Sequence, residues 1–247
     1  MNDAQRPIAP LTTTAYEPPP RWAMKDPASH LRLWIVALVG LASDLWTKAW
    51  AFETLDWDNS RVLIKNLASL QLSLNPGALF GLGAGFASVF VGASVLALMF
   101  VLYLFANSAA ARRSMHVALG LVLAGALGNL YDRTRHEAFV LHYDQPQRRV
   151  VGTLVKEEPG LYFIGDYPSG AGARAYRRDD VAEAGPEPVV RDFIKIEAKL
   201  GRFSLWPWIF NLADAYLVIG VGILLLHFWF EKKPAPIAAD SQQPATT

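Results

Sequence analysis

The chain has 247 residues, of which 52% are apolar, and its formal net charge at pH 7 is +1. This charge does not provide the broad basic surface that nucleic-acid binding requires. The absence of cysteine excludes disulfides, thiol catalysis and thiolate metal sites. Length and composition together favour a small membrane bundle over an ordinary globular domain.

Four apolar segments reach or approach the roughly 20 residues that a membrane-spanning helix needs. The predicted spans are about residues 31–52, 86–106, 115–133 and 206–230. The first contains Asp44 and Lys48, which are four positions apart and therefore share one helix face. Residues 1–30 are rich in proline and polar side chains and are predicted to be a disordered tail, and residues 231–247 form a second tail.

Basic residues flank the predicted spans on one side of the membrane. They are Arg21, Lys25 and Arg32 before the first span, Arg112 and Arg113 after the second, and Lys232 and Lys233 after the fourth. The positive-inside rule then places both termini in the cytoplasm, and residues 53–85 and 132–205 outside. Because the polar groups of the spans all lie toward the outer side, a site near that interface is expected.

The external segments contain strand-like runs. Residues 61–74 show strand-like apolar spacing and precede the turn-forming sequence NPG. Further runs occur at residues 138–143, 149–155, 161–164 and 188–196. Residues 167–188 are rich in Gly, Pro, Ala and charge and are predicted to be flexible. The predicted fold class is therefore an all-α membrane protein with four transmembrane helices and small external β-rich segments, including an inserted subdomain at residues 137–188.

Asp214 is the polar residue that is hardest to explain within a lipid-facing helix. It lies roughly 10 Å below the start of the fourth apolar run, at about 1.5 Å per residue. An aspartate at the centre of a membrane helix costs about 2.5 to 3.5 kcal/mol. Asn211 precedes it by one turn, and no lysine or arginine within the run neutralises it. A functional role is therefore favoured over a hydrogen bond that only fixes helix packing.

The other polar groups each allow a structural interpretation. Asp44 and Lys48 form an ion pair that either tethers the helix or supports a site. The sequence GALGNLYDR, residues 125–133, favours small-residue helix packing with an interfacial Asp–Arg pair. By spacing alone, Asp192 beside Arg191 is interpreted as a surface carboxylate.

Several other chemistries lack their motifs. The sequence contains no HExxH, GxxxxGK[ST] or GxSxG motif, and its five histidines show no metal-ligand spacing. An ion or solute carrier stays open as an alternative, with Asp44, Asp132 and Asp214 forming a proton path. A catalytically inactive scaffold is a third possibility.

Four motifs, in this order, resemble those of lipoprotein signal peptidase, also called signal peptidase II, a family of integral membrane aspartic endopeptidases. They are DLWTK at residues 44–48, NPGALFG at 75–81, GALGNLYDR at 125–133 and FNLADA at 210–215. A fifth, VVRDF at residues 189–193, resembles the family's VVDF with one residue inserted. Each motif is weak alone, but the ordered set is highly specific and covers about residues 31–230.

The resemblance implies a four-helix membrane protein that removes signal peptides from diacylglyceryl-modified prolipoproteins. Cleavage is then expected just before the lipidated cysteine, at the outer face of the cytoplasmic membrane. The implied catalytic dyad is Asp192 and Asp214, which activates water and needs no metal or nucleotide cofactor. Positions that match residues lining or bracing the family's site are Asp44, Lys48, Asn75, Gly125, Asn129, Arg133 and Asn211, and Asp132 matches an acid thought structural. We expect membrane lipid as the surroundings, no nucleic-acid partner, and a monomer.

The chain departs from the family pattern in the spacing of two motifs. Sixty positions separate Asp132 from Asp192, where the corresponding motifs are usually close. This gap and the extra Arg191 leave Asp132 as the best alternative partner for Asp214. Further alternatives are Asp144 and Asp166. Two carboxylates about 4 Å apart repel by roughly 4 kcal/mol at an effective dielectric constant of about 20, so one of them keeps a proton, as an aspartic dyad requires.

Overall fold

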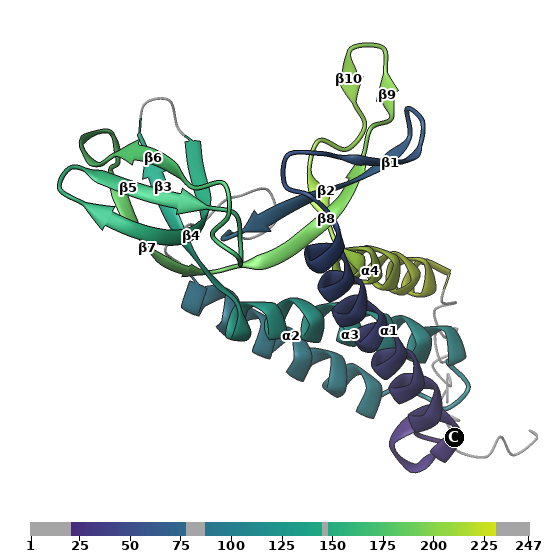
Figure 1. Ribbon diagram of the computed structural model, residues 1–247. Helices are drawn as coiled ribbons and strands as arrows, with labels where there is room; N and C mark the ends of the chain where they lie inside the picture. The colour runs from purple at the N-terminus through teal and green to yellow at the C-terminus, as the bar shows by residue number, and fades with distance from the viewer. Residues whose placement is uncertain (1–20, 78–86, 145–147, 231–247) are drawn as a thin grey trace, which may run out of the picture.

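The computed structural model describes residues 21–77, 87–144 and 148–230, and both predicted tails lie largely outside these ranges. Four α-helices pack side by side, and the β-strands gather on one side of them (Figure 1). The helices are α1 (Pro27–Thr54), α2 (Ala87–Ala106), α3 (Arg113–Arg135) and α4 (Leu212–Phe230). The described residues also contain two short 3-10 helices, η1 (Ala23–Lys25) and η3 (Arg178–Asp180).

Three of the helices, α1, α3 and α4, are long and apolar enough to cross a membrane by length and composition. In α2 the described apolar stretch, Ser94–Ala106, is shorter. The structure begins α1 before the predicted residue 31, because Asp26 caps the helix and Pro27 occupies its first turn. The Asp26 carboxylate accepts a hydrogen bond of 2.9 Å from the backbone N–H of Ser29.

The fourth helix begins later than the sequence predicts. Residues 206–210 were expected to be helical, but Ile209–Phe210 forms strand β11, which pairs with β8. Pro207 disfavours the helical conformation at Trp206 and has no N–H for a helical hydrogen bond. Both effects delay the start of α4.

Asn211 and Asp214 cap the start of α4 in a reciprocal arrangement. The side-chain oxygen of Asn211 accepts from the N–H of Asp214 at 3.0 Å, and the Asp214 carboxylate accepts from the N–H of Asn211 at 3.3 Å. Asp214 therefore lies in the first turn of α4. The prediction that it lies roughly 10 Å below the start of the helix was wrong, because it counted the extended residues before Asn211 as helix.

The strands of the described residues form three antiparallel sheets of four, five and two strands. The four-stranded sheet has the order β1 (Arg61–Ile64), β2 (Ala68–Asn75), β8 (Val190–Ile196) and β11 (Ile209–Phe210). The five-stranded sheet has the order β6 (Arg174–Arg177), β5 (Leu161–Gly165), β4 (Arg148–Glu158), β3 (Glu137–Tyr143) and β7 (Glu183–Pro188). The third sheet is the hairpin of β9 (Lys199–Leu200) and β10 (Phe203–Ser204).

The predicted all-α fold class is wrong, because these sheets are a major part of the molecule rather than small additions to a helix bundle. The prediction that residues 167–188 are flexible is also wrong, since β6 and β7 lie within them. β7 pairs with β3 from Glu183 to Pro188 despite its poor strand composition. Its prolines are tolerated because β7 is an edge strand of the sheet.

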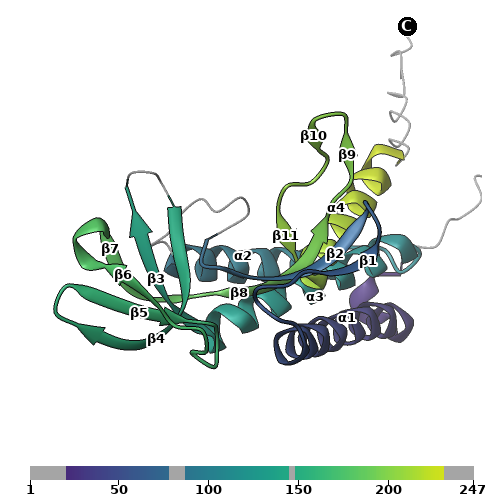
Figure 2. The ribbon, with the colours of Figure 1, turned by 45° about the horizontal axis from the view of Figure 1, so that its top comes forward.

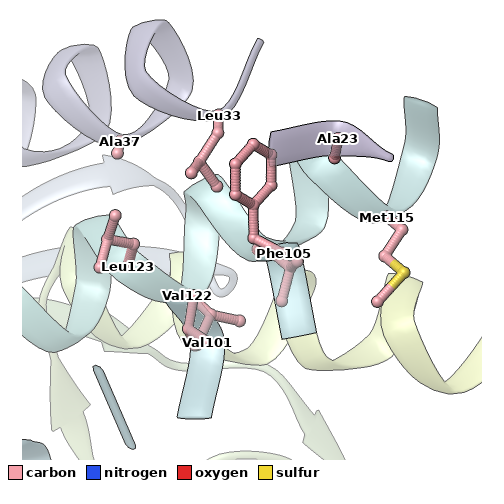
Figure 3. Close-up of a cluster of buried hydrophobic side chains, with 9 residues drawn as sticks. Ala23, Leu33, Ala37, Val101, Phe105, Met115, Val122 and Leu123 are labelled. Atoms are coloured by element: carbon pink, nitrogen blue, oxygen red, sulfur yellow. The ribbon is translucent and has the colours of Figure 1, made fainter. Parts of the chain in front are cut away.

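The helices pack through an apolar cluster and through close contacts at glycine. Leu33 of α1 and Phe105 of α2 point into the same space, together with residues of α3 (Figure 3). At Gly125 of α3, an added Cβ atom would collide with the backbone carbonyl of Ala213 in α4. Lipid tails are as apolar as these side chains, so close packing at small residues, rather than exclusion of water, holds the helices together.

The five-stranded sheet has its own core and also packs against the four-stranded sheet. Its core contains Leu141, Tyr162 and Ile164, all almost completely buried. A second cluster joins Ala138 of β3 to Leu74 of β2 and includes the fully buried residue 189 between β7 and β8. The sheet thus extends from the end of α3 and runs directly into β8 (Figure 2).

Candidate active site

Two carboxylates that are 22 positions apart in the sequence face one cavity of about 870 Å³. Asp192 lies in β8, opposite Ser73 of β2, and is only 2% exposed. Asp214 lies in the first turn of α4, directly after β11 has paired with β8. The β8–β11 pairing therefore brings Asp192 of β8 and Asp214 at the start of α4 to the same cavity.

Three asparagines bind this pair of carboxylates. The side-chain amide of Asn211 donates to Asp192 at 2.6 Å, and that of Asn75 donates to the other Asp192 oxygen at 3.3 Å. The amide of Asn129 donates to Asp214 at 2.8 Å. Asn211 also donates to the side-chain oxygen of Asn129 at 3.3 Å, so both carboxylates belong to one hydrogen-bond network.

The environment of Asp192 favours its protonated form. Burial, and next the negative charge of nearby Asp214, raise the pKa of Asp192 well above its usual value of 3.8. The hydrogen bond from Asn211 and the charge of Lys48 act in the opposite direction and are outweighed. The pKa of Asp192 is thus shifted in the direction that favours retention of its proton beside the Asp214 carboxylate.

A buried lysine lies beneath the asparagine network. The Lys48 ammonium contacts Asp44 at 2.8 Å and Asp132 at 3.3 Å, and it donates to Asn129 at 3.1 Å. The side chains of Lys48, Asp44 and Asp132 are fully buried. The two carboxylates compensate the charge of the buried ammonium, and Asn129 accepts a hydrogen bond from it.

Asp44 also fixes α1 against the other helices. Its second oxygen accepts from the backbone N–H of Ala213 at 2.8 Å, within the first turn of α4. Gly128 of α3 allows this approach, since a Cβ atom there would collide with the Asp44 carboxylate. Asp44 and Lys48 therefore position the helix ends that carry Asn129 and Asp214.

Arg191 contacts Asp132 and does not line the cavity. Its guanidinium contacts Asp132 at 2.8 and 3.3 Å, and its backbone N–H donates to the same carboxylate at 3.0 Å. Alternation along β8 directs Asp192 and Val190 to the cavity and Arg191 to the opposite face. Asp192 and Asp214 line the cavity, whereas Asp132 does not.

Arg191 occupies an ordinary position in the strand register, opposite Leu74. The irregularity in this pairing lies further along, where β2 carries one more residue than β8 between Leu70 and Ser73. No bulge in β8 marks Arg191 as inserted.

Arg133 and Asn75 hold the turn that follows β2. The Arg133 guanidinium donates to the carbonyl of Gly77 at 3.0 Å, and the Asn75 side chain accepts from the N–H of Gly77 at 3.0 Å. Arg133 and Asn75 also line the cavity. Residues 78–81 of the NPGALFG motif lie outside the described residues.

The rest of the described cavity wall is largely apolar; it includes residues of α2, α3 and the four-stranded sheet, and three further regions also contribute. One side of α4 contributes Leu217 and its neighbours. Trp206 and Trp208 line it just before α4 begins. The third region is β4 of the five-stranded sheet, which contributes Arg149 and Val151. The site is thus an apolar groove with a small number of polar groups at one place.

Comparison with known proteins identifies the family. The model of the family described as "Signal peptidase (SPase) II" matches residues 36–230. A lipoprotein signal peptidase of Desulforapulum autotrophicum is 34% identical over 209 residues, which is 83% of this chain and 95% of that protein. One of Rhodopirellula baltica is 30% identical over 207 residues, 81% of this chain and 73% of the relative. The chain belongs to the signal peptidase II family.

The fold agrees with a solved structure described as a bacterial membrane enzyme. The two structures superpose with a TM-score of 0.54 and are 21% identical in sequence, and the likeness covers 88% of this chain and 98% of the other. At this identity the likeness supports the fold alone. The family match makes the chain a protease of the membrane, so the carrier considered from the sequence is not supported, and the resemblance to signal peptidase II is confirmed.

Every site residue named from the signal peptidase II motifs lies in or beside this network. Asp192, Asp214, Asn75, Asn129 and Arg133 line the cavity, and Asn211 binds both Asp192 and Asn129. The supporting groups further from the cavity are Asp44, Lys48, Asp132 and Gly125.

Sequence reasoning missed two arginines in this signal peptidase II member. Arg191 was regarded only as a disturbance next to Asp192, yet it neutralises Asp132 across a gap of 59 positions. Arg149 was not singled out, although it lines the cavity. Strand alternation around Asp192 was the available signal for Arg191, whereas no local pattern marks Arg149.

Proposed function

We propose that the chain is an aspartic endopeptidase that removes signal peptides from diacylglyceryl-modified prolipoproteins, cutting just before the lipidated cysteine. The observation that carries this proposal is the pair Asp192 and Asp214, which line one cavity and are linked through Asn211. The lipoprotein signal peptidases among the relatives support the substrate class.

In the proposed mechanism Asp214 is the base and Asp192 the acid. Asp214 receives hydrogen bonds from Asn129 and from the backbone at the N-terminus of α4, which stabilise a negative charge. The pKa of Asp192 is raised, which keeps its proton available. Asp214 takes a proton from water, the water oxygen attacks the scissile carbonyl carbon, and Asp192 protonates the carbonyl oxygen.

The second half of the reaction restores both carboxyl groups. The tetrahedral diol collapses and the C–N bond breaks. Asp214 gives its proton to the leaving amine, while a diol hydroxyl returns a proton to Asp192. The atoms balance with water as the only co-reactant, so no metal or other cofactor is required by this mechanism.

The cavity wall supports a lipid-bearing substrate. The apolar side of α4 at Leu217–Ile219 faces the cavity and also belongs to a helix apolar enough to cross the membrane. An acyl chain lying in the bilayer can dock along this side while the peptide bond next to the lipidated cysteine reaches Asp192 and Asp214. Trp206 and Trp208 precede the helix, as expected for aromatic residues at a membrane surface.

The proposed orientation places both termini in the cytoplasm and the carboxylate pair near the outer face of the cytoplasmic membrane. The basic residues at the start of α1 and between α2 and α3 support this orientation through the positive-inside rule. Residues 31–230 then form the peptidase domain, with residues 137–188 as an external insertion, and the chain acts as a monomer without a nucleic-acid partner.

Substitution of each carboxylate tests the dyad. Asp192→Asn and Asp214→Asn are each expected to abolish cleavage of a synthetic diacylglyceryl-cysteine peptide by purified protein, since neither amide can exchange the proton. Asp144→Asn, at an exposed position outside the cavity, serves as the matched control and is expected to keep wild-type cleavage. Near-wild-type cleavage by Asp192→Asn in protein that inserts normally would refute the dyad.

A further inference from the structure

Two β-hairpins leave the same end of the four-stranded sheet. The first joins β1 to β2, and the second, β9–β10, follows β8 (Figure 1). The backbone N–H of Glu197, just after β8, donates to the carbonyl of Leu67 in the first hairpin at 2.9 Å. Residues 61–67 and 199–205 therefore lie in one region of the molecule, and together they are called the hairpin surface.

The hairpin surface exposes large apolar side chains. Val62, Leu63 and Ile64 follow one another in β1 and are 57%, 56% and 56% exposed. Three consecutive strand residues cannot all point to one face, even with the irregular pairing between Val62 and Ile64, so both faces of β1 are apolar and uncovered. Leu200 and Phe203, which are paired across the second hairpin, are 73% and 71% exposed. A flat protein partner would cover one face of β1, whereas a fluid apolar phase covers both.

Basic residues border these apolar side chains. The hairpin surface contains no acidic residue and four basic ones, which are Arg61, Lys65, Lys199 and Arg202. All four are exposed, and their side chains form no ion pair or hydrogen bond within the part of the chain that the structure describes. Apolar side chains beside free cations are complementary to a lipid surface that carries anionic phosphates above its acyl chains.

The hairpins are attached closely to helices that are long and apolar enough to cross a membrane. β1 begins at Arg61, seven positions after the last residue of α1, and α4 begins at Leu212, eight positions after the last residue of β10. Leu205 directly precedes Trp206 and Trp208, aromatic residues of the kind that mark a membrane surface. The backbone groups at the free edge of β1 need hydrogen-bond partners, which water and lipid headgroups supply and the hydrocarbon core does not. The headgroup layer therefore fits the hairpin surface best.

We propose that the hairpin surface binds the outer leaflet of the bilayer, with its apolar side chains in the headgroup layer and its basic side chains on the phosphates of anionic phospholipids. This inference rests on the proposed orientation of the helices, which was part of the proposed function. The two hairpins continue β2 and β8, the strands that carry Asn75 and Asp192. Binding of the hairpin surface to lipid thus fixes these strands at a constant depth, level with the peptide bond of a lipid-anchored substrate.

Single-cysteine labelling tests this surface, since the natural chain contains no cysteine. Leu63→Cys and Phe203→Cys each receive a fluorescent label, and the full-length protein is placed in phosphatidylcholine nanodiscs with or without phosphatidylglycerol. Asp179→Cys, at the exposed helix η3, is the control position. A lipid with a spin label near its headgroup quenches labels that contact the bilayer, and aqueous iodide quenches labels in water. In anionic nanodiscs the labels at positions 63 and 203 are expected to be quenched by the lipid and protected from iodide, and the label at position 179 to show the opposite.

A matched pair of charge variants tests the preference for anionic lipid. With the label at position 63, Arg202→Gln is expected to lower the ratio of lipid-contacting to water-exposed label about 5-fold in anionic nanodiscs, the scale of one basic residue at an anionic surface. Arg177→Gln removes the same charge from an exposed position of β6 and is expected to leave this ratio unchanged. Salt at about 1 M is expected to reduce the difference between anionic and neutral nanodiscs, because it screens the exposed charges.

The outcomes separate this inference from the proposed function. Iodide quenching at positions 63 and 203 as strong as at position 179 overturns binding of the hairpin surface to lipid. Protection from iodide without quenching by the spin-labelled lipid shows that protein, such as a second copy of the chain, covers the surface, and overturns it as well. Equal ratios in neutral and anionic nanodiscs, or equal effects of Arg202→Gln and Arg177→Gln, overturn the role of the basic residues. Failure of the same preparations to cleave a diacylglyceryl-cysteine peptide contradicts the proposed function and leaves the labelling result intact.

Discussion

The contact between Arg191 and Asp132 leads to a quantitative prediction. Arg191→Met removes a guanidinium that binds a carboxylate with a fully buried side chain at 2.8 and 3.3 Å. Removing one partner of a buried ion pair costs about 3 to 5 kcal/mol. In this variant Asp132 still contacts Lys48 at 3.3 Å and still accepts from the backbone N–H of residue 191 at 3.0 Å. The expected decrease in the free energy of unfolding is therefore at the lower end of this range, about 3 kcal/mol.

The assay is thermal unfolding of the purified protein in detergent, followed by far-ultraviolet circular dichroism. A loss of about 3 kcal/mol corresponds to a decrease in Tm of roughly 6 to 12 °C for a chain of this size. Lys195→Met, on the same strand, is the control. Its ammonium donates at 2.8 Å to Gln71, a half-buried neutral partner, so its loss is expected to cost about 1 kcal/mol.

A double-variant cycle shows whether the loss comes from this pair. The double variant Arg191→Met/Asp132→Asn is expected to be more stable than the sum of the two single variants predicts, because no uncompensated charge stays buried. A Tm of Arg191→Met within about 2 °C of the wild-type value, or strict additivity in the cycle, would show that Arg191 does not neutralise Asp132.

Two further predictions concern pH and helix packing. The pKa of Asp192 is raised in the folded protein above its usual value of 3.8, so the unfolded chain loses this proton at a lower pH than the folded protein does. The free energy of unfolding therefore falls as pH rises from 3.8 through the raised pKa. Asp192→Asn removes this loss, so its Tm is expected to exceed that of the wild type at pH 7 and to match it near pH 4; equal differences at both pH values would contradict this. Gly125→Ala is expected to lower stability by about 1 to 3 kcal/mol, because its Cβ would collide with the Ala213 carbonyl. Gly222→Ala is its control, since no atom lies within 4 Å of the added Cβ, and equal Tm values for the two variants would refute the packing argument.

Local sequence patterns were sufficient for many of the elements. Apolar runs of spanning length predicted the approximate positions of the helices, and alternating runs predicted β3, β4, β5 and β8. Both signals depend on residues close together in the chain, so they can be recognised without knowledge of the fold. The same signals failed for β6 and β7, because those strands form through pairing with β5 and β3 rather than through their own composition.

The sequence by itself determined the family, because its motifs occur in one order with recognisable residues. It also determined that Asp214 needs polar partners, since an isolated carboxylate is costly near a membrane helix. It did not determine which acid lies beside Asp214, because a gap of sixty positions separates Asp132 from Asp192.

Only the tertiary structure decided the surroundings of each acid. Pairing of β8 with β2 and β11 directs Asp192 toward Asp214, and alternation along β8 turns Arg191 toward Asp132. It also decided that a strand of the inserted sheet brings Arg149 to the cavity. These arrangements depend on strand register and on contacts between distant segments, which no local pattern in the chain encodes.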